Sequence, residues 1–154
     1  MRWIFVGCLI ALAGCTALGF GSTPPPEGDP AAVLAKRLAQ SGAAVRTTGT
    51  SSGEPLSAAA TILCVNNERV QVFTFETDHE RDAAANHIDR DDPSHVGTSI
   101  VEWIGTPQFW TADRAVVLYA GDADATIAAL SSLLGEPFAR GRGIDRGMVE
   151  RACE

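Results

Sequence analysis

The sequence predicts an α+β fold in which about three helices cover an antiparallel sheet of four to five strands, as a two-layer sandwich. Two observations favour this class. Pairs of strand-like segments followed by a helical segment occur twice, at residues 59–89 and 98–134, and helices that follow hairpins can cover one face of a single sheet. Residues 115–119 are apolar without polar alternation, which predicts a central strand.

Residues 30–41 are predicted to form the first helix. Asp29 suits the capping position, Pro30 suits the first helical position, and Gly42 permits a left-handed stop. The apolar side chains expected to share one face of this helix are Val33, Leu34 and Leu38. This pattern predicts an amphipathic helix that packs on the sheet.

Three strands are predicted between the first and second helices. Residues 44–48 form the first, which leads into a surface loop rich in glycine and serine. Residues 59–65 and 70–75 are apolar runs separated by a connection that contains Asn66 and Asn67. Because asparagine tolerates positive φ, this spacing predicts a β-hairpin.

A second hairpin and two helices complete the predicted domain. Thr77 begins a capping-box pattern, with glutamate three residues later, and opens a helix expected to end near Asp89. The strands of the second hairpin are predicted at residues 98–104 and 115–119. The third helix follows and stops at Gly135. The apolar side chains of its buried face are Ile127, Leu130 and Leu134.

The amino terminus has the pattern of a secretory signal: Arg2, an apolar run of about nine residues and small residues before Cys15. The run from Trp3 is interrupted by glycines and falls short of the roughly 20 residues that span a bilayer. The triplet at residues 13–15, Ala-Gly-Cys, resembles the lipobox of bacterial lipoproteins. This resemblance implies cleavage after residue 14 and acylation of Cys15. Cys8 also follows a glycine, but the apolar run before it is too short.

These boundaries divide the chain into four segments. They are a signal peptide (1–14), a lipidated cysteine with a flexible tether rich in proline and glycine (15–29), the α+β domain (30–139) and a tail rich in glycine and arginine (140–154). The 140 residues that remain after cleavage are enough for one domain. The expected location is the extracytoplasmic face of the cell membrane, with the lipid on Cys15 as anchor.

The charge of the chain bears on its partners. Arg2 is the only charged residue among the first 14, so the mature chain carries 11 basic and 19 acidic residues, a net charge of −8. An acidic domain of this kind is a poor nucleic-acid binder. It also lacks a polybasic patch for anionic lipids, so attachment to the membrane is expected to depend on acyl chains.

Cys64 and Cys153 are the only cysteines left once Cys8 is removed with the signal and Cys15 is acylated. Export would place them where disulfides persist, and an even pair without other partners favours a bond between them. The alternative is a buried Cys64 in a strand and a frayed Cys153 near the chain end. With a disulfide, the tail is expected to lie along the strand that carries Cys64.

The domain itself looks like a group of small, uncharacterised bacterial envelope lipoproteins. The segments that carry this resemblance are residues 70–75, 101–109, 115–121 and 134–139. These motifs are structural in character, so the resemblance implies no activity. Gln108 stands where a histidine would be expected, which argues against a catalytic role at that position.

Metal binding is the main alternative that the sequence offers. His87, Asp91 and His95 can gather round the end of the second helix as nitrogen and carboxylate ligands, although a solvated acidic helix end has the same composition. Asp89, Asp91 and Asp92 suggest calcium less well, because their loop lacks the central glycine and closing glutamate of an EF-hand.

Catalytic motifs do not emerge from the sequence. It contains no G-x-S-x-G elbow, and the glycines of the tail miss the G-x-G-x-x-G spacing of dinucleotide-binding loops. We therefore assign no catalytic residue and no cofactor. The arginines of the tail form either an anion-binding group or a solvated surface. They are Arg140, Arg142 and Arg146.

Three aromatic residues cluster at the connection predicted between the strands of the second hairpin. They are Trp103, Phe109 and Trp110. At a hairpin tip such rings form a candidate contact patch for a protein partner or an apolar ligand, whereas the alternative is packing under the helices. The expected function is therefore a non-catalytic binding or scaffolding module of the cell envelope, with ligand unknown. A metal-dependent enzyme or metal-binding protein is the alternative.

Overall fold

The computed structural model describes residues 28–143 and residue 153 and has an α+β architecture. Within these residues, a six-stranded antiparallel sheet has the strand order β1-β2-β3-β7-β6-β8, and β4 and β5 form a separate small sheet. The strands are β1 (Val45–Ser51), β2 (Ala60–Val65), β3 (Glu68–Thr74), β4 (His95–Val96), β5 (Ser99–Ile100), β6 (Pro107–Ala112), β7 (Ala115–Ala120) and β8 (Ala139–Arg140). The helices are α1 (Pro30–Gln40), α2 (Asp78–Asn86) and α3 (Asp124–Leu134).

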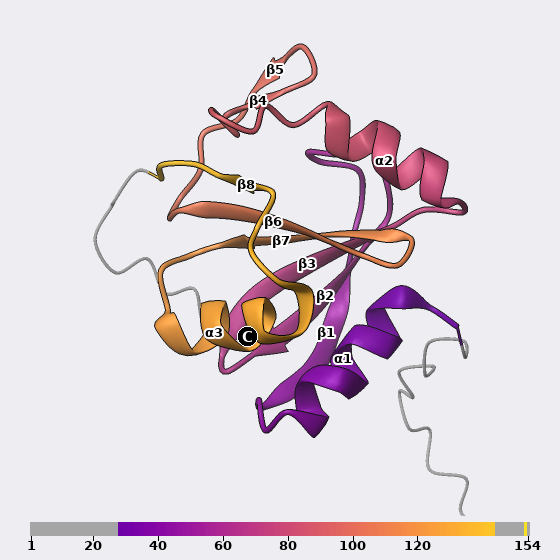
Figure 1. Ribbon diagram of the computed structural model, residues 1–154, viewed down its shortest axis with the longest axis vertical. Helices are drawn as coiled ribbons and strands as arrows, with labels where there is room; N and C mark the ends of the chain where they lie inside the picture. The colour runs from indigo at the N-terminus through magenta and orange to yellow at the C-terminus, as the bar shows by residue number, and fades with distance from the viewer. Residues whose placement is uncertain (1–27, 144–152, 154) are drawn as a thin grey trace, which may run out of the picture.

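The helices lie on both faces of the main sheet, so the two-layer prediction was wrong. Figure 1 shows α1 and α3 on one side of the sheet and α2 with the β4–β5 hairpin on the other. We call these sides the α1–α3 face and the α2 face. Along β7, Val117 packs in the core of the α1–α3 face, whereas Val116 and Leu118 pack in that of the α2 face. The unbroken apolar run of β7 is therefore buried on both sides, and β7 is a central strand as predicted.

The described main sheet also has six strands, more than the four to five predicted, and one of the predicted strands was assigned to the wrong residues. Only Ser99–Ile100 of residues 98–104 forms a strand, and it pairs with β4 in the small sheet. The partner of β7 is β6, which pairs with it from Pro107↔Ala120 to Ala112↔Ala115 across a tight turn. The edge strand next to β6 is β8, which lies where we expected the tail to begin.

The turns and helix starts predicted from local sequence signals are confirmed. Asp29 caps α1 by accepting a hydrogen bond from the Ala31 amide. Asn66 and Asn67 both have positive φ in the β2–β3 turn, at 51° and 68°. Thr77 and Glu80 form both hydrogen bonds of the capping box. The helix that they open is shorter than predicted, because α2 ends at Asn86 and not near Asp89.

No helix within residues 28–143 is long and apolar enough to cross a membrane.

Candidate functional site

The structure joins Cys64 and Cys153 at disulfide-bonding distance. Cys64 lies on β2, and its side chain points away from the α1–α3 face because side chains alternate along a strand and Leu63 and Val65 pack in the core of that face. The Cα atoms of the two cysteines are 5.7 Å apart, within the 4.4–6.8 Å typical of disulfides. The predicted pairing distance is confirmed. The residues of the tail between 143 and 153 lie outside the described residues.

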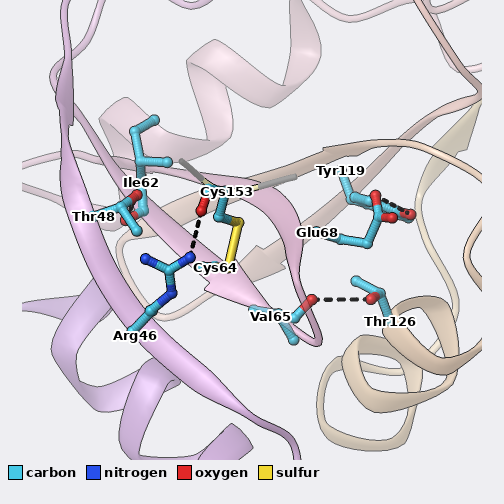
Figure 2. The surroundings of a disulfide bond; sticks show 9 residues. All are labelled: Arg46, Thr48, Ile62, Cys64, Val65, Glu68, Tyr119, Thr126 and Cys153. Carbon is cyan, nitrogen blue, oxygen red and sulfur yellow. Dashed lines mark hydrogen bonds between the residues drawn. A yellow bond between two sulfur atoms is a disulfide. The ribbon is translucent and has the colours of Figure 1, made fainter. Parts of the chain in front are cut away.

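A second contact holds the backbone of Cys153 at this place. The Arg46 guanidinium donates a hydrogen bond to the Cys153 carbonyl oxygen, and Arg46 stands opposite Cys64 in the β1–β2 register. Figure 2 shows the two contacts side by side. Cys64 and Cys153 are only 3% and 8% exposed. The disulfide is therefore shielded from solvent and is attached to both β1 and β2.

Polar contacts on the α1–α3 face tie the end of the β2–β3 hairpin to the start of α3. The Thr126 hydroxyl donates to the Val65 carbonyl oxygen over 3.1 Å. The Tyr119 hydroxyl donates to a Glu68 carboxylate oxygen over 3.1 Å and accepts from the Ala123 amide over 3.0 Å. The side-chain contacts of Thr126 and Tyr119 are drawn in Figure 2. The strand that carries Cys64 is thus fixed from both sides.

The aromatic residues proposed as a contact patch are buried, so that prediction is corrected. Trp103, Phe109 and Trp110 are 9%, 0% and 1% exposed. Trp103 and Phe109 pack edge to face in the α2-face core, with ring centroids 5.7 Å apart. Trp110 points to the opposite face, where its indole nitrogen donates to the Gly135 carbonyl oxygen. Phe109 and Trp110 are both core residues because adjacent positions of β6 alternate between two buried faces.

The histidines and acids after α2 do not assemble a metal site. His95 pairs with Asp92, with Nδ1 3.1 Å from Oδ2, and the described residues hold no group of three histidine, cysteine or acidic side chains placed for a metal ion. His87 instead lines a cleft of about 520 Å³ between α2, the β4–β5 hairpin and the loop at residues 54–57. His87, Asp91 and Asp89 are exposed.

Asp92 organises the acidic turn through hydrogen bonds. The Ser94 hydroxyl and amide both donate to its Oδ1, over 2.6 Å and 3.2 Å. These bonds, and the neighbouring His95, hold the pKa of the Asp92 carboxyl below its usual range. The Asp92 carboxylate therefore stays ionised to a lower pH than an unperturbed aspartate does.

Cys15, the predicted acylation site, lies outside the described residues.

No family model, curated protein sequence or solved structure matches the chain.

Proposed function

We propose that this protein is a lipid-anchored module of the bacterial cell envelope that binds or scaffolds a partner and catalyses no reaction. Its anchor is an acyl modification of Cys15, and its domain lies at the extracytoplasmic face of the cell membrane. In this proposal residues 1–14 are removed, residues 15–29 are the tether, residues 30–139 are the domain and residues 140–154 are the tail. The protein would stand with the small envelope lipoproteins that its signal and domain resemble.

The pairing of Cys64 with Cys153 carries this proposal. If the first 14 residues are removed and Cys15 is acylated, these two are the only cysteines that remain. Disulfides form and persist in oxidising compartments and are rare in the cytosol. A buried pair at disulfide distance therefore supports export, which is the step that the amino-terminal signal predicts.

The chemistry of the described side chains supports a binding role. A cysteine in a disulfide has no thiolate with which to act as a nucleophile, and Cys64 is in that state. His95 hydrogen-bonds to Asp92 rather than joining His87 and Asp91 around one point. Two clefts on the α2 side, one at His87 and one beside the acidic turn, offer concave surfaces for a ligand.

Metabolic labelling with palmitate followed by membrane fractionation tests the anchor. We expect Cys15→Ser to lose both the label and the membrane association, because this change removes the acylated sulfur. Cys8→Ser is the matched control and should keep both. Globomycin, which inhibits the lipoprotein signal peptidase, should make the unmodified chain accumulate as a larger precursor. A Cys15→Ser protein that is still labelled and still sediments with membranes would contradict the proposal.

A further inference from the structure

A second cleft, of about 580 Å³, is lined by charged side chains of both signs. It lies between the acidic turn after α2 and the end of the main sheet at β8. Its lining residues are Asp91, Asp92, Ser94, Arg140, Gly141 and Arg142. The sequence pointed to the acids as one group and to the arginines as another, but not to their meeting.

Gly141 brings the two groups together. Its backbone amide donates to the Pro107 carbonyl oxygen over 2.9 Å, which extends the attachment of β8 to β6. A Cβ atom at this position would lie 2.9 Å from Pro107 Cγ and 3.2 Å from Pro93 Cδ. A larger residue would therefore push the arginine-bearing segment away from the acidic turn, so the cleft depends on a glycine between the two arginines.

The acidic wall of the cleft is held in one conformation. The Asp89 carboxylate accepts hydrogen bonds from the amides of Asp91 and Asp92, over 2.9 Å and 3.2 Å. The Trp103 indole nitrogen donates to the Pro93 carbonyl oxygen over 2.9 Å, from within the α2-face core. The Asp91 and Asp92 side chains therefore project from a fixed backbone and need little ordering when a ligand binds.

The opposite charges in this cleft do not neutralise one another directly. Among the described residues, the ion pairs join Arg81 to its neighbouring acids and His95 to Asp92, so Arg140 and Arg142 make no ion pair with Asp91 or Asp92. The four side chains sum to zero charge yet stand apart around one cavity. A small molecule that carries only a negative charge is attracted by the arginines and repelled by the aspartates, and the reverse holds for a cation.

We infer that this cleft binds a small zwitterion, with the oxyanion of the ligand at Arg140 and Arg142 and its ammonium group at Asp91 and Asp92. The guanidinium fork matches carboxylate and phosphate oxygens, and ammonium donates to carboxylates, so each end of the ligand makes charge-assisted hydrogen bonds. This inference rests on the binding role proposed above and gives that role a ligand class. Peptide ends and phosphoethanolamine head groups are the two sources of such chemistry.

Isothermal titration calorimetry on the full-length protein in non-ionic detergent tests the inference. The probes are glycylglycine and phosphoethanolamine. The controls carry charge of one sign only, and they are acetate, inorganic phosphate and ethylammonium. We expect at least one zwitterion to bind about tenfold more tightly than each control, because every control lacks the charge-assisted contacts of one end. The preferred zwitterion identifies the source. Equal binding of a zwitterion and its matching anion, or no binding of either zwitterion, would overturn the inference.

Variants locate the binding. Arg142→Gln and Asp91→Asn should each weaken the preferred zwitterion about tenfold, because each removes one charged contact. Arg37→Gln, an exposed position of α1 on the opposite face, is the matched control and should leave the affinity unchanged. Thermal unfolding confirms that the variants are folded. Undiminished affinity in both cleft variants would overturn the inference. None of these readouts depends on acylation of Cys15, so failure here is distinct from failure of the anchor.

Discussion

The two faces of the main sheet are covered in different ways. On the α1–α3 face, two helices of 11 residues place leucine side chains directly on the strands, and Leu34, Leu38 and Leu130 are at most 2% exposed. On the α2 face the helix has nine residues, all described, and Ala85 alone is buried. The rest of that face is covered by the β4–β5 hairpin and by irregular chain around Trp103 and Phe138.

We propose from this difference that the α1–α3 face serves stability alone, whereas the α2 side also carries the binding clefts. The α1–α3 face has regular helix-on-sheet packing, whereas the clefts that contain His87 and the four charged side chains both involve the acidic turn or the β4–β5 hairpin of the α2 side. Irregular chain between regular elements is where binding residues tend to occur, because loops tolerate variation that helices packed on a core do not. The predictions that follow test this division.

The disulfide should have the largest effect on stability, because it links Cys153 to a central part of the chain, Cys64 on β2. Its cysteines are separated by 89 residues, and the chain-entropy model gives a cross-link of this length about 4–5 kcal/mol. We expect Cys153→Ser to lower the free energy of unfolding by that amount, as measured by urea denaturation under non-reducing conditions. Dithiothreitol should lower the stability of the unmodified chain equally and leave the variant unchanged.

The same bond gives a direct chemical readout. Mass spectrometry of the exported, alkylated protein should find both Cys64 and Cys153 unmodified by the alkylating reagent before reduction and modified after it. Two free thiols without reduction would show that Cys153 is not covalently linked to β2, and the proposed extracytoplasmic location would lose its main support.

Packing on the α1–α3 face should give the next largest effect. Leu130 is completely buried in α3, and replacing a buried leucine with alanine removes apolar contacts and leaves a cavity. We expect Leu130→Ala to cost about 2–5 kcal/mol of unfolding free energy. Leu133→Ala, in the same helix but at a half-buried position, is the matched control and should cost less than half as much. Equal costs would mean that the complete burial of Leu130 does not give this face the stabilisation expected of it.

Local chemistry explains which parts of the fold were predictable from the sequence. The Asp29 cap, the Asn66-Asn67 turn and the capping box depend on residues within a few positions of one another, and all three were predicted correctly. Residues 98–104 and 107–112 are both rich in β-forming side chains, so propensity alone did not decide which would pair with β7. The tight turn at Asp113, with φ of 47°, favours the nearer segment.

The layers and the cleft were harder to predict. The apolar run of β7 already implied that both faces of the sheet are covered, because a strand with one solvated face alternates, yet we assigned all helices to one face. The cysteine pair was predictable from the expected compartment. The position of Asp91 and Arg140 in one cleft was not predictable, because it requires β8 to pair with β6. A two-residue strand gives almost no signal in the sequence.

The smallest predicted effect concerns the acidic turn of the α2 face. The Asp92 carboxyl has a lowered pKa, with the Ser94 hydroxyl as the largest cause, the Ser94 amide next and the charge of His95 a smaller one. Hydrogen bonds to the charged form favour that form. Because the folded pKa is depressed, the stabilisation is present above the unfolded value and is lost as the pH falls through the folded pKa. Carboxyl-carbon NMR titration should show Ser94→Ala raising the Asp92 pKa further than His95→Ala does. The opposite order would mean that the charge of His95, and not the hydrogen bonds of the turn, is the larger cause of the lowered Asp92 pKa.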